Sequence, residues 1–211
     1  MPSYMGDYGG RYGDAAKDRE RKLVRAIDSV FGPKSIDNFE LIVVADGCAR
    51  TMELVRGMEL FQRDGRLRLL SIPKQPLWSE KVRNAGIVNA RGQWVAYLDT
   101  DDAFTPEHLP TLAHALALLP DEARWAYFDD MVQERGEWQL RLARLDKPGG
   151  AGTSNIAHRA GIFWPVISFR WPDMGYDHDR QMIRHLKGYG EPRYLGAGGY
   201  MVMHIPRQYD I

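Results

Sequence analysis

Hydrophobic and polar positions follow one another along the chain in blocks that predict alternating helices and strands. After an opening loop, one face of a helix from about residue 14 carries five apolar side chains at helical spacing: Leu23, Ala26, Ile27, Val30 and Phe31. Gly32 is its expected C-cap. Residues 39–45 form an almost unbroken apolar run, as in a strand covered on both faces. The pattern then predicts a helix at 51–61, a strand at 66–72, a helix at 78–91, a strand at 95–98 and a helix at 105–119 with Thr105 as N-cap.

This alternation favours an α/β fold with a mainly parallel sheet flanked by helices on both faces. Beyond residue 120 the pattern is less regular. Residues 124–130 and 137–145 flank Gly136 and predict a hairpin, and 146–155 a flexible loop. A helix is predicted at 176–186 and a last, glycine-interrupted strand at 193–206. We interpret residues 1–211 as one domain with a regular half, 1–120, and a more irregular half, 121–211.

The composition excludes few functions but indicates the environment in which the protein works. Lys+Arg and Asp+Glu balance at 28 each, so no overall charge attracts nucleic acid or an anionic membrane. Cys48 is the only cysteine, which rules out an intrachain disulfide and a cysteine-based zinc site. No apolar run is long enough to span a bilayer, and we recognise no signal peptide. A cytoplasmic location is therefore expected.

Two predicted strands end in acidic loops. Asp46 follows the strand at 39–45, and Asp99, Asp101 and Asp102 follow the strand at 95–98. Neighbouring carboxylates raise one another's pKa, and a divalent cation bound by oxygens would relieve that repulsion. In a parallel sheet both loops would lie at the carboxyl edge, where ligands bind. The alternative is that these aspartates cap helices or form turns; three within four residues favour a metal or catalytic site.

The order of motifs resembles that of family 2 glycosyltransferases with the GT-A fold. The matching segments are "PSY" near the start, "FELIVVADG", "RNAGIVNARGQWVAYLDTDDAFTPEHL" and a late helix that opens with acids. The resemblance covers nearly the whole chain. It implies a metal-dependent, inverting transfer of a sugar from a nucleotide sugar, a UDP-sugar in the first instance, to a hydroxyl of a glycan or another acceptor. Mn²⁺ or Mg²⁺ would be the cofactor, and residues 1–120 and 121–211 the donor and acceptor halves.

For the donor, the resemblance assigns residues by motif position. Asp99-Thr100-Asp101 resembles the DXD motif, with Asp101 on the metal and Asp99 on the ribose or the metal. Pro2, Ser3 and Tyr4 match the loop that holds the nucleobase, where Tyr4 could stack on the ring. The remaining donor candidates are Asp46, where the family usually has two acids and this chain has Ala45-Asp46, and Arg83, which could instead form a salt bridge on a helix face.

For catalysis, the resemblance points to the helix that opens within "YDHDRQMIRHL". Asp179 aligns with the general base and Asp177 is the second candidate, although acids at a helix start also serve as caps. His204 could be a late metal ligand or simply a packed histidine. The loop at 149–154 and the aromatic side chains of Trp164, Phe169 and Trp171 are candidates for the acceptor side, or else core residues.

The chain departs from the family's pattern at its start. In the family, an apolar strand precedes the "PSY" position and lies centrally in the sheet, whereas here only Met1 precedes Pro2. Either the start is truncated, or another segment fills the gap, or the sheet lacks that strand. Two other functions stay open: a nucleotide-sugar-binding module without turnover, and a sugar-nucleotide pyrophosphorylase, for which the opening segment is a poor phosphate loop.

Overall fold

The structure is a computed structural model that describes residues 1–6, 18–75, 80–134, 136–147, 149–165, 177–196 and 198–203, apart from the side chains of Asp177 and His178. Its helices are α1 Arg19–Val30, α2 Ala49–Gly57, α3 Glu59–Arg63, α4 Glu80–Asn89, α5 His108–Ala117, the short 3₁₀ helix η2 Thr153–Asn155 and α6 Asp177–Lys187. Its strands are β1 Pro2–Ser3, β2 Leu41–Asp46, β3 Leu67–Ile72, β4 Trp94–Ala96, β5 Ala103–Phe104, β6 Trp125–Tyr127, β7 Asp130–Glu134, β8 Glu137–Arg141, β9 Ile156–Arg159, β10 Arg193–Tyr194 and β11 Tyr200–Val202.

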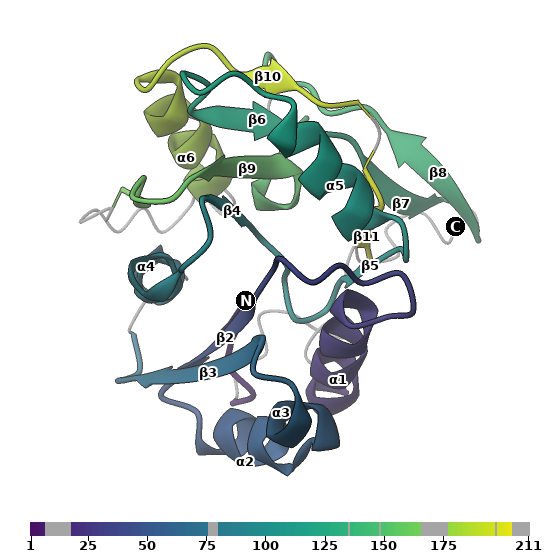
Figure 1. Cartoon of the computed structure of the whole chain (residues 1–211), viewed down its shortest axis with the longest axis vertical. Coiled ribbons are helices and arrows are strands. Elements are labelled where there is room, and N and C mark those ends of the chain that lie inside the picture. Colours follow the sequence, from purple (N-terminus) through teal and green to yellow (C-terminus); the bar gives the residue numbers. More distant parts are fainter. Residues whose placement is uncertain are drawn as a thin grey trace.

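The strands form three sheets, of which the first is parallel. It has the order β1-β2-β3, and all six residues of β2 pair with β3. The second, β10-β6-β9-β4, and the third, β5-β11-β7-β8, mix parallel and antiparallel pairs. Figure 1 shows β2 and β3 with α1, α2 and α3 at one end of the molecule, and β6, β9 and α6 at the other. The predicted α/β class is confirmed.

Two hydrophobic clusters form the core, and the larger one reaches from one of these ends to the other. The larger joins α1, β2, α5 and β11, with Leu23, Ile27 and Val43 completely buried. The smaller is built on Trp125, Ile156 and the apolar face of α6. The helical spacing of apolar residues in α1 correctly predicted which of its side chains enter the core: Leu23, Ala26, Ile27 and Val30 are all buried.

Several element boundaries differ from the prediction. The C-cap of α1 is Phe31, not Gly32, and the N-cap of α5 is Glu107, not Thr105. The expected helix at 51–61 is two helices, because Met58 takes an extended conformation between them. Part of the opening, expected as a loop, is strand β1, whereas residues 7–17 lie outside the described chain.

The irregular half differs more. The segment 124–130 does not form one arm of a hairpin, because β6 pairs with β9 and only Asp130 onward, as β7, pairs with β8. The predicted last strand is two short strands, β10 and β11, in different sheets. Strand β9 was not predicted at all. Short strands in mixed sheets carry too little periodic signal to be separated by pattern alone.

Candidate active site

The acid at the end of β2 is held by the segment that follows β3. The Lys74 ammonium lies 2.6 Å from Oδ2 of Asp46, and the backbone N–H of Gln75 donates to Oδ1 at 2.7 Å. Gly47 makes this close approach possible: its φ is 59°, and a Cβ there would lie 2.6 Å from the backbone nitrogen of Lys74. Asp46 is buried, so its orientation is fixed by these donors.

The "PSY" segment lies beside this acid. Pro2 and Ser3 pair with Val44 and Ala45 of β2, and the buried Ser3 hydroxyl lies 3.0 Å from that of Thr51 in α2. Lys74 connects the segment with Asp46, because its ammonium also lies 4.2 Å from the ring centroid of Tyr4. The structure thus brings three candidate donor residues, Ser3, Tyr4 and Asp46, to one edge of the sheet.

The carboxylates of the loop after β4 have different surroundings. Asp99 accepts a hydrogen bond from Arg83 at 3.0 Å, and its own backbone N–H donates to the Tyr200 hydroxyl at 3.1 Å. Asp102 points inward: it accepts from the Tyr200 hydroxyl at 2.7 Å and from the backbone N–H of Met203 at 2.7 Å. Burial, followed by the charge of Asp102, raises the pKa of Tyr200 well above its ordinary value.

This arrangement changes the argument made from the sequence. The Asp102 carboxylate already accepts hydrogen bonds from protein donors, so it does not need a cation. The candidate metal ligands within this loop are therefore Asp99 and Asp101. Both side chains are partly exposed, and Arg25 fixes the loop by donating to the Asp101 carbonyl at 2.5 Å. Thr100 is likewise half-buried.

Carboxylate oxygens are the ligands that Mg²⁺ and Mn²⁺ prefer, so this loop has suitable donors. Within the described residues, however, no three His, Cys, Asp or Glu side chains are grouped to hold a metal ion. A further ligand would have to come from elsewhere. His204 lies outside the described chain, but the backbone N–H of the preceding residue, Met203, donates a hydrogen bond to Asp102 beside the motif.

Arg83 is held between the acidic loop and a buried aromatic network. Its guanidinium lies 4.7 Å from the Trp164 ring centroid, and the side chain is 5% exposed. The Trp164 indole N–H donates to the Tyr97 hydroxyl at 2.8 Å, and that hydroxyl lies 2.5 Å from Nε2 of His158. Within the described part of the chain, the ion pair of Arg83 is with Asp99, which lies in another element, and not along the face of its own helix.

The candidate acceptor side is only partly described. Trp164 is buried in the core rather than open to a ligand, and Phe169 and Trp171 lie outside the described residues. Asp179, in the first turn of α6, accepts a hydrogen bond from the Thr153 hydroxyl at 2.5 Å. The loop at 149–154 thus contacts the candidate base, whereas the side chain of Asp177 is not described.

Sequence reasoning missed several residues that hold this site. Lys74, Tyr200 and Thr153 contact Asp46, Asp102 and Asp179 respectively. Lys74 could have been suggested by its position just after a strand that ends at the same edge as β2. Tyr200 and Thr153 carry no such signal, because their partners are about 98 and 26 residues away.

The fold and the acidic loops define a GT-A type α/β protein. The sequence matches the family described as Glycosyl transferase family 2 over residues 15–170, most of the chain, and the protein belongs to that family.

Curated relatives match over part of their length. The chain is 36% identical over 96 residues to the succinoglycan biosynthesis protein ExoO of Rhizobium meliloti (strain 1021), covering 45% of this chain and 26% of that protein. It is 35% identical over 75 residues to the putative glycosyltransferase EpsH of Bacillus subtilis (strain 168), covering 36% and 21%. The chain thus matches about a quarter of each relative's length.

Solved structures share the fold at low identity. S. aureus TarS 1–349 superposes with a TM-score of 0.65 at 16% identity, over 96% of this chain and 58% of that one. The mannosyltransferase PcManGT of Pyrobaculum calidifontis gives a TM-score of 0.53 at 14% identity, over 99% and 56%. Among the described residues, no helix is long and apolar enough to cross a membrane.

Proposed function

We propose that the protein transfers a sugar from a nucleotide-sugar donor, a UDP-sugar, to an acceptor hydroxyl with inversion, and that the reaction needs Mn²⁺ or Mg²⁺. The observation that carries this proposal is the division of roles in the loop at 99–102. Asp102 anchors the loop inward, whereas Asp99 is 31% exposed beside Arg83 at the carboxyl end of its strand. Family membership supports a transferase over a pyrophosphorylase.

Structural relatives support the donor and the metal. TarS has been solved with UDP-GlcNAc and with UDP, and PcManGT with GDP-Man and Mn²⁺. Glucosyl-3-phosphoglycerate synthase of Mycobacterium tuberculosis, solved with Mn²⁺ and UDP-glucose, superposes with a TM-score of 0.50. The present site offers the carboxylate oxygens of Asp99 and Asp101 in the loop after β4.

On the donor side, each residue has a stated task. A divalent ion, when bound by Asp99, Asp101 and His204, would supply positive charge to balance the diphosphate leaving group. Tyr4 would stack on the nucleobase, and Asp46, oriented by Lys74 and Gln75, would accept hydrogen bonds from the base or ribose. Arg83 would hold Asp99 in place.

On the acceptor side, Asp179 would act as general base. Its Thr153 hydrogen bond orients the carboxylate, which would take the proton from the acceptor hydroxyl while that oxygen attacks the anomeric carbon from the opposite face. A single displacement inverts the configuration, and no sugar–enzyme bond forms. Asp177 is the second candidate for this role.

The test is one set of variants with two measurements. Thermal stability would be measured with UDP, GDP, CDP and dTDP, each with Mn²⁺, Mg²⁺ or EDTA, and donor turnover would be followed in parallel. A stabilisation of about 2.7 kcal/mol is expected at a hundred times the Kd, with UDP and metal only. Asp101→Asn should lose it, whereas the exposed control Asp37→Asn should keep it.

Asp179→Asn separates binding from chemistry. It should keep the nucleotide-dependent shift but lose about 10²- to 10⁴-fold in turnover, the usual contribution of a general base. Binding without turnover in the unmodified protein would instead favour the non-catalytic binding module. No stabilisation by any nucleotide would contradict the donor site.

A further inference from the structure

Asp130, the first residue of β7, is a buried acid to which the proposed mechanism gives no task. Its side chain is completely buried, and Arg141 of β8 donates to its two carboxylate oxygens, from Nε at 2.8 Å and from Nη2 at 2.5 Å. Burying an ion pair carries a large desolvation cost, and apolar residues of similar volume often stabilise a core equally well. Stability alone therefore does not explain an acid at this position.

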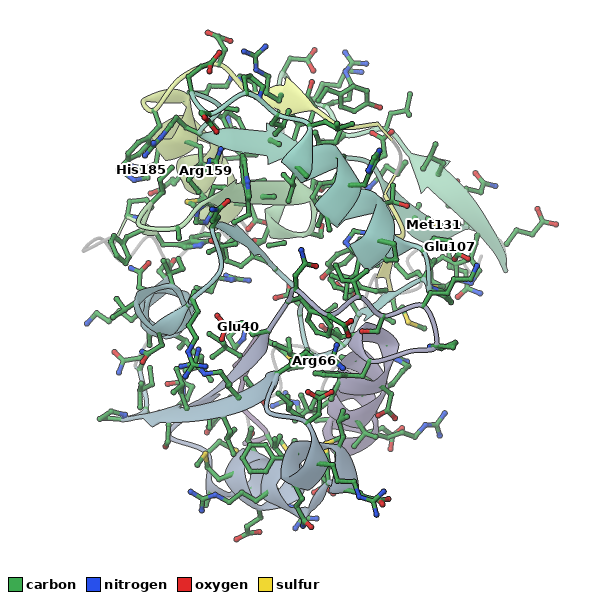
Figure 2. The ribbon with its side chains drawn as sticks, in the orientation of Figure 1. Glu40, Arg66, Glu107, Met131, Arg159 and His185 are labelled. Atoms are coloured by element: carbon green, nitrogen blue, oxygen red, sulfur yellow. The ribbon has the colours of Figure 1, made fainter. Side chains whose placement is uncertain are left out.

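The register of the third sheet places Asp130 in a row of side chains that crosses four strands. Tyr200 of β11 pairs with Phe104 of β5 on one side and with Asp130 on the other. Asp130 in turn pairs with Arg141 of β8. Met131, the next residue of β7 (Figure 2), lies by alternation on the other face of the sheet and is partly exposed. Asp130 thus faces the same interior side as Tyr200, one strand spacing of about 4.8 Å away.

Tyr200 connects this row of side chains with the loop that carries the candidate metal ligands. Its hydroxyl accepts from the backbone N–H of Asp99 at 3.1 Å and donates to Oδ2 of Asp102 at 2.7 Å. Two points of the loop are therefore fixed relative to β11. The position of the row determines where the metal loop lies.

Asp130 connects the same row with the segment that holds the candidate base. The Ser154 hydroxyl donates to Oδ2 of Asp130 at 3.4 Å, and the preceding residue, Thr153, donates to Oδ1 of Asp179 at 2.5 Å. Both hydroxyls belong to η2, which lies beside β11. One row of the sheet thus contacts the metal loop through Tyr200 and the segment beside the candidate base through Asp130.

The short segment at 152–155 can transmit this position because hydrogen bonds hold it together. Oδ1 of Asn155 accepts from the Gly152 N–H at 2.9 Å, and its Nδ2 donates to the Phe128 carbonyl at 3.0 Å. The Asn155 N–H also donates to the Gly152 carbonyl at 3.1 Å. A Cβ at Gly152 would lie 3.0 Å from Oδ2 of Asp179, so the segment packs directly on that carboxylate. A shift of η2 would therefore move the surroundings of Asp179.

We propose that Asp130 is a positioning residue for the candidate base. Through Ser154 it fixes η2, and through Thr153 it fixes the Asp179 carboxylate at the distance from the metal loop that the transfer requires. Arg141 balances the buried charge of Asp130 and holds its carboxylate in one orientation. The proposal rests on the proposed transferase function, in which Asp179 takes the proton of the acceptor. Loss of Asp130 should slow the chemical step and leave nucleotide binding unchanged.

The experiment compares Asp130→Asn with Asp129→Asn in the full chain. Asp129 is the neighbouring buried acid, but its carboxylate accepts from the Ala143 N–H and the Tyr194 hydroxyl. The release of UDP from UDP-GlcNAc and from UDP-glucose, with Mn²⁺ and with water as acceptor, is measured well below the Tm of each variant. Asp130→Asn should lose about 10- to 100-fold in kcat, as expected for a misplaced reacting group, and keep the UDP-dependent rise in Tm. Asp129→Asn should have a lower Tm and an unchanged kcat.

Ser154→Ala tests the route by which Asp130 acts. The double variant with Asp130→Asn should lose no more kcat than Asp130→Asn alone, because both changes break the same connection. Hydrogen exchange adds a measurement that needs no turnover. The backbone amides of Gly152 and Asn155 should exchange faster in Asp130→Asn and in Ser154→Ala, but not in Asp129→Asn.

Three results would overturn the positioning role of Asp130. They are unchanged kcat and exchange in Asp130→Asn, equal losses of kcat in the two acid variants, and losses that multiply in the double variant with Ser154→Ala. Failure of the transferase function has a different signature, because the unmodified protein would then show neither UDP release nor stabilisation by UDP. That result would overturn both proposals, whereas normal turnover in all variants would overturn only this one.

Discussion

At the scale of single residues, two buried histidines show which protonation state the fold requires. Nδ1 of His108 accepts a hydrogen bond from the Gly199 N–H at 2.9 Å. Nε2 of His158 lies 2.5 Å from the Tyr97 hydroxyl, whereas its Nδ1 donates to the Arg159 carbonyl at 2.9 Å. Each ring uses one nitrogen as an acceptor, so each is neutral. Burial lowers the pKa of His108 to about 3 and that of His158 to about 4.

These shifts predict a loss of stability in acid. Between pH 6.5 and about 4 the unfolded chain binds protons that the folded chain does not, so the free energy of unfolding falls as the pH falls. We expect a loss on the order of a few kcal/mol between pH 7 and pH 4. His108→Asn keeps an acceptor for Gly199 and cannot titrate, so its stability should depend less steeply on pH.

Chemical denaturation at a series of pH values measures this dependence. The control is His114→Asn, which changes an exposed histidine of the same helix and should leave the slope as it is. Parallel pH profiles for His108→Asn and the unmodified protein would contradict the assignment of His108 as a neutral, buried group.

At the scale of elements, the regular half was predictable and the irregular half was not. The elements α1, β2, β3, α4, β4 and α5 follow apolar patterns that the structure retains, with errors at their ends, whereas the two-residue strands β1 and β5 were not predicted. In the second half, β9, β10 and β11 are two to four residues long, and their partners are set by contacts between distant segments. A pattern of that length does not specify whether β6 pairs with the hairpin or with β9.

The turn between β2 and α2 gives a prediction at this scale. Gly47→Ala would force a side chain into the left-handed region at φ 59° and within 2.6 Å of the Lys74 backbone. We expect a loss of about 1–2 kcal/mol or more from conformation alone, with added displacement of Lys74 from Asp46. Gly57→Ala, in the last turn of α2 with open space around it, should be neutral or stabilising by up to about 1 kcal/mol.

Urea denaturation of the two glycine variants tests this contrast. Nucleotide affinity should fall in Gly47→Ala and stay unchanged in Gly57→Ala, because only the first touches the Asp46 loop. Similar stability for both variants would show that the close approach at Gly47 can relax at little cost.

At the scale of the whole molecule, the sequence predicted candidate site residues but not the residues that hold them in place. The order of the motifs predicted Tyr4, Asp46 and Asp99 at the ends of strands. In the structure, β1 ends at Ser3, β2 at Asp46 and β4 at Ala96. The roles of Asp102 and Trp164 could not be predicted, since one is turned inward by Tyr200 and the other is buried under Arg83. Such roles depend on contacts between residues about 80 to 100 positions apart in the sequence, and local sequence patterns do not predict these contacts.

One contact of this kind connects the two halves of the chain directly. The Asn84 side chain in α4 accepts from the Trp164 N–H at 2.7 Å and donates to the Trp164 carbonyl at 3.0 Å, across 80 residues of sequence. The amide thus clamps the backbone of the residue that packs on Arg83. Loss of the clamp should affect both the stability of the fold and the position of Arg83 against Asp99.

We therefore expect Asn84→Ala to lower the free energy of unfolding by about 1–3 kcal/mol, because it removes both hydrogen bonds and leaves backbone groups without partners. It should also raise the KM for the donor, since Arg83 orients Asp99. The matched control is Asn89→Ala on the same helix, whose exposed side chain donates to the Ala85 carbonyl within its own helix. That control should stay within about 0.5 kcal/mol of the unmodified protein.

Denaturant unfolding together with donor kinetics distinguishes the outcomes. A loss of stability with an unchanged KM would make the clamp purely structural. Equal behaviour of the two variants would show that the halves are joined elsewhere.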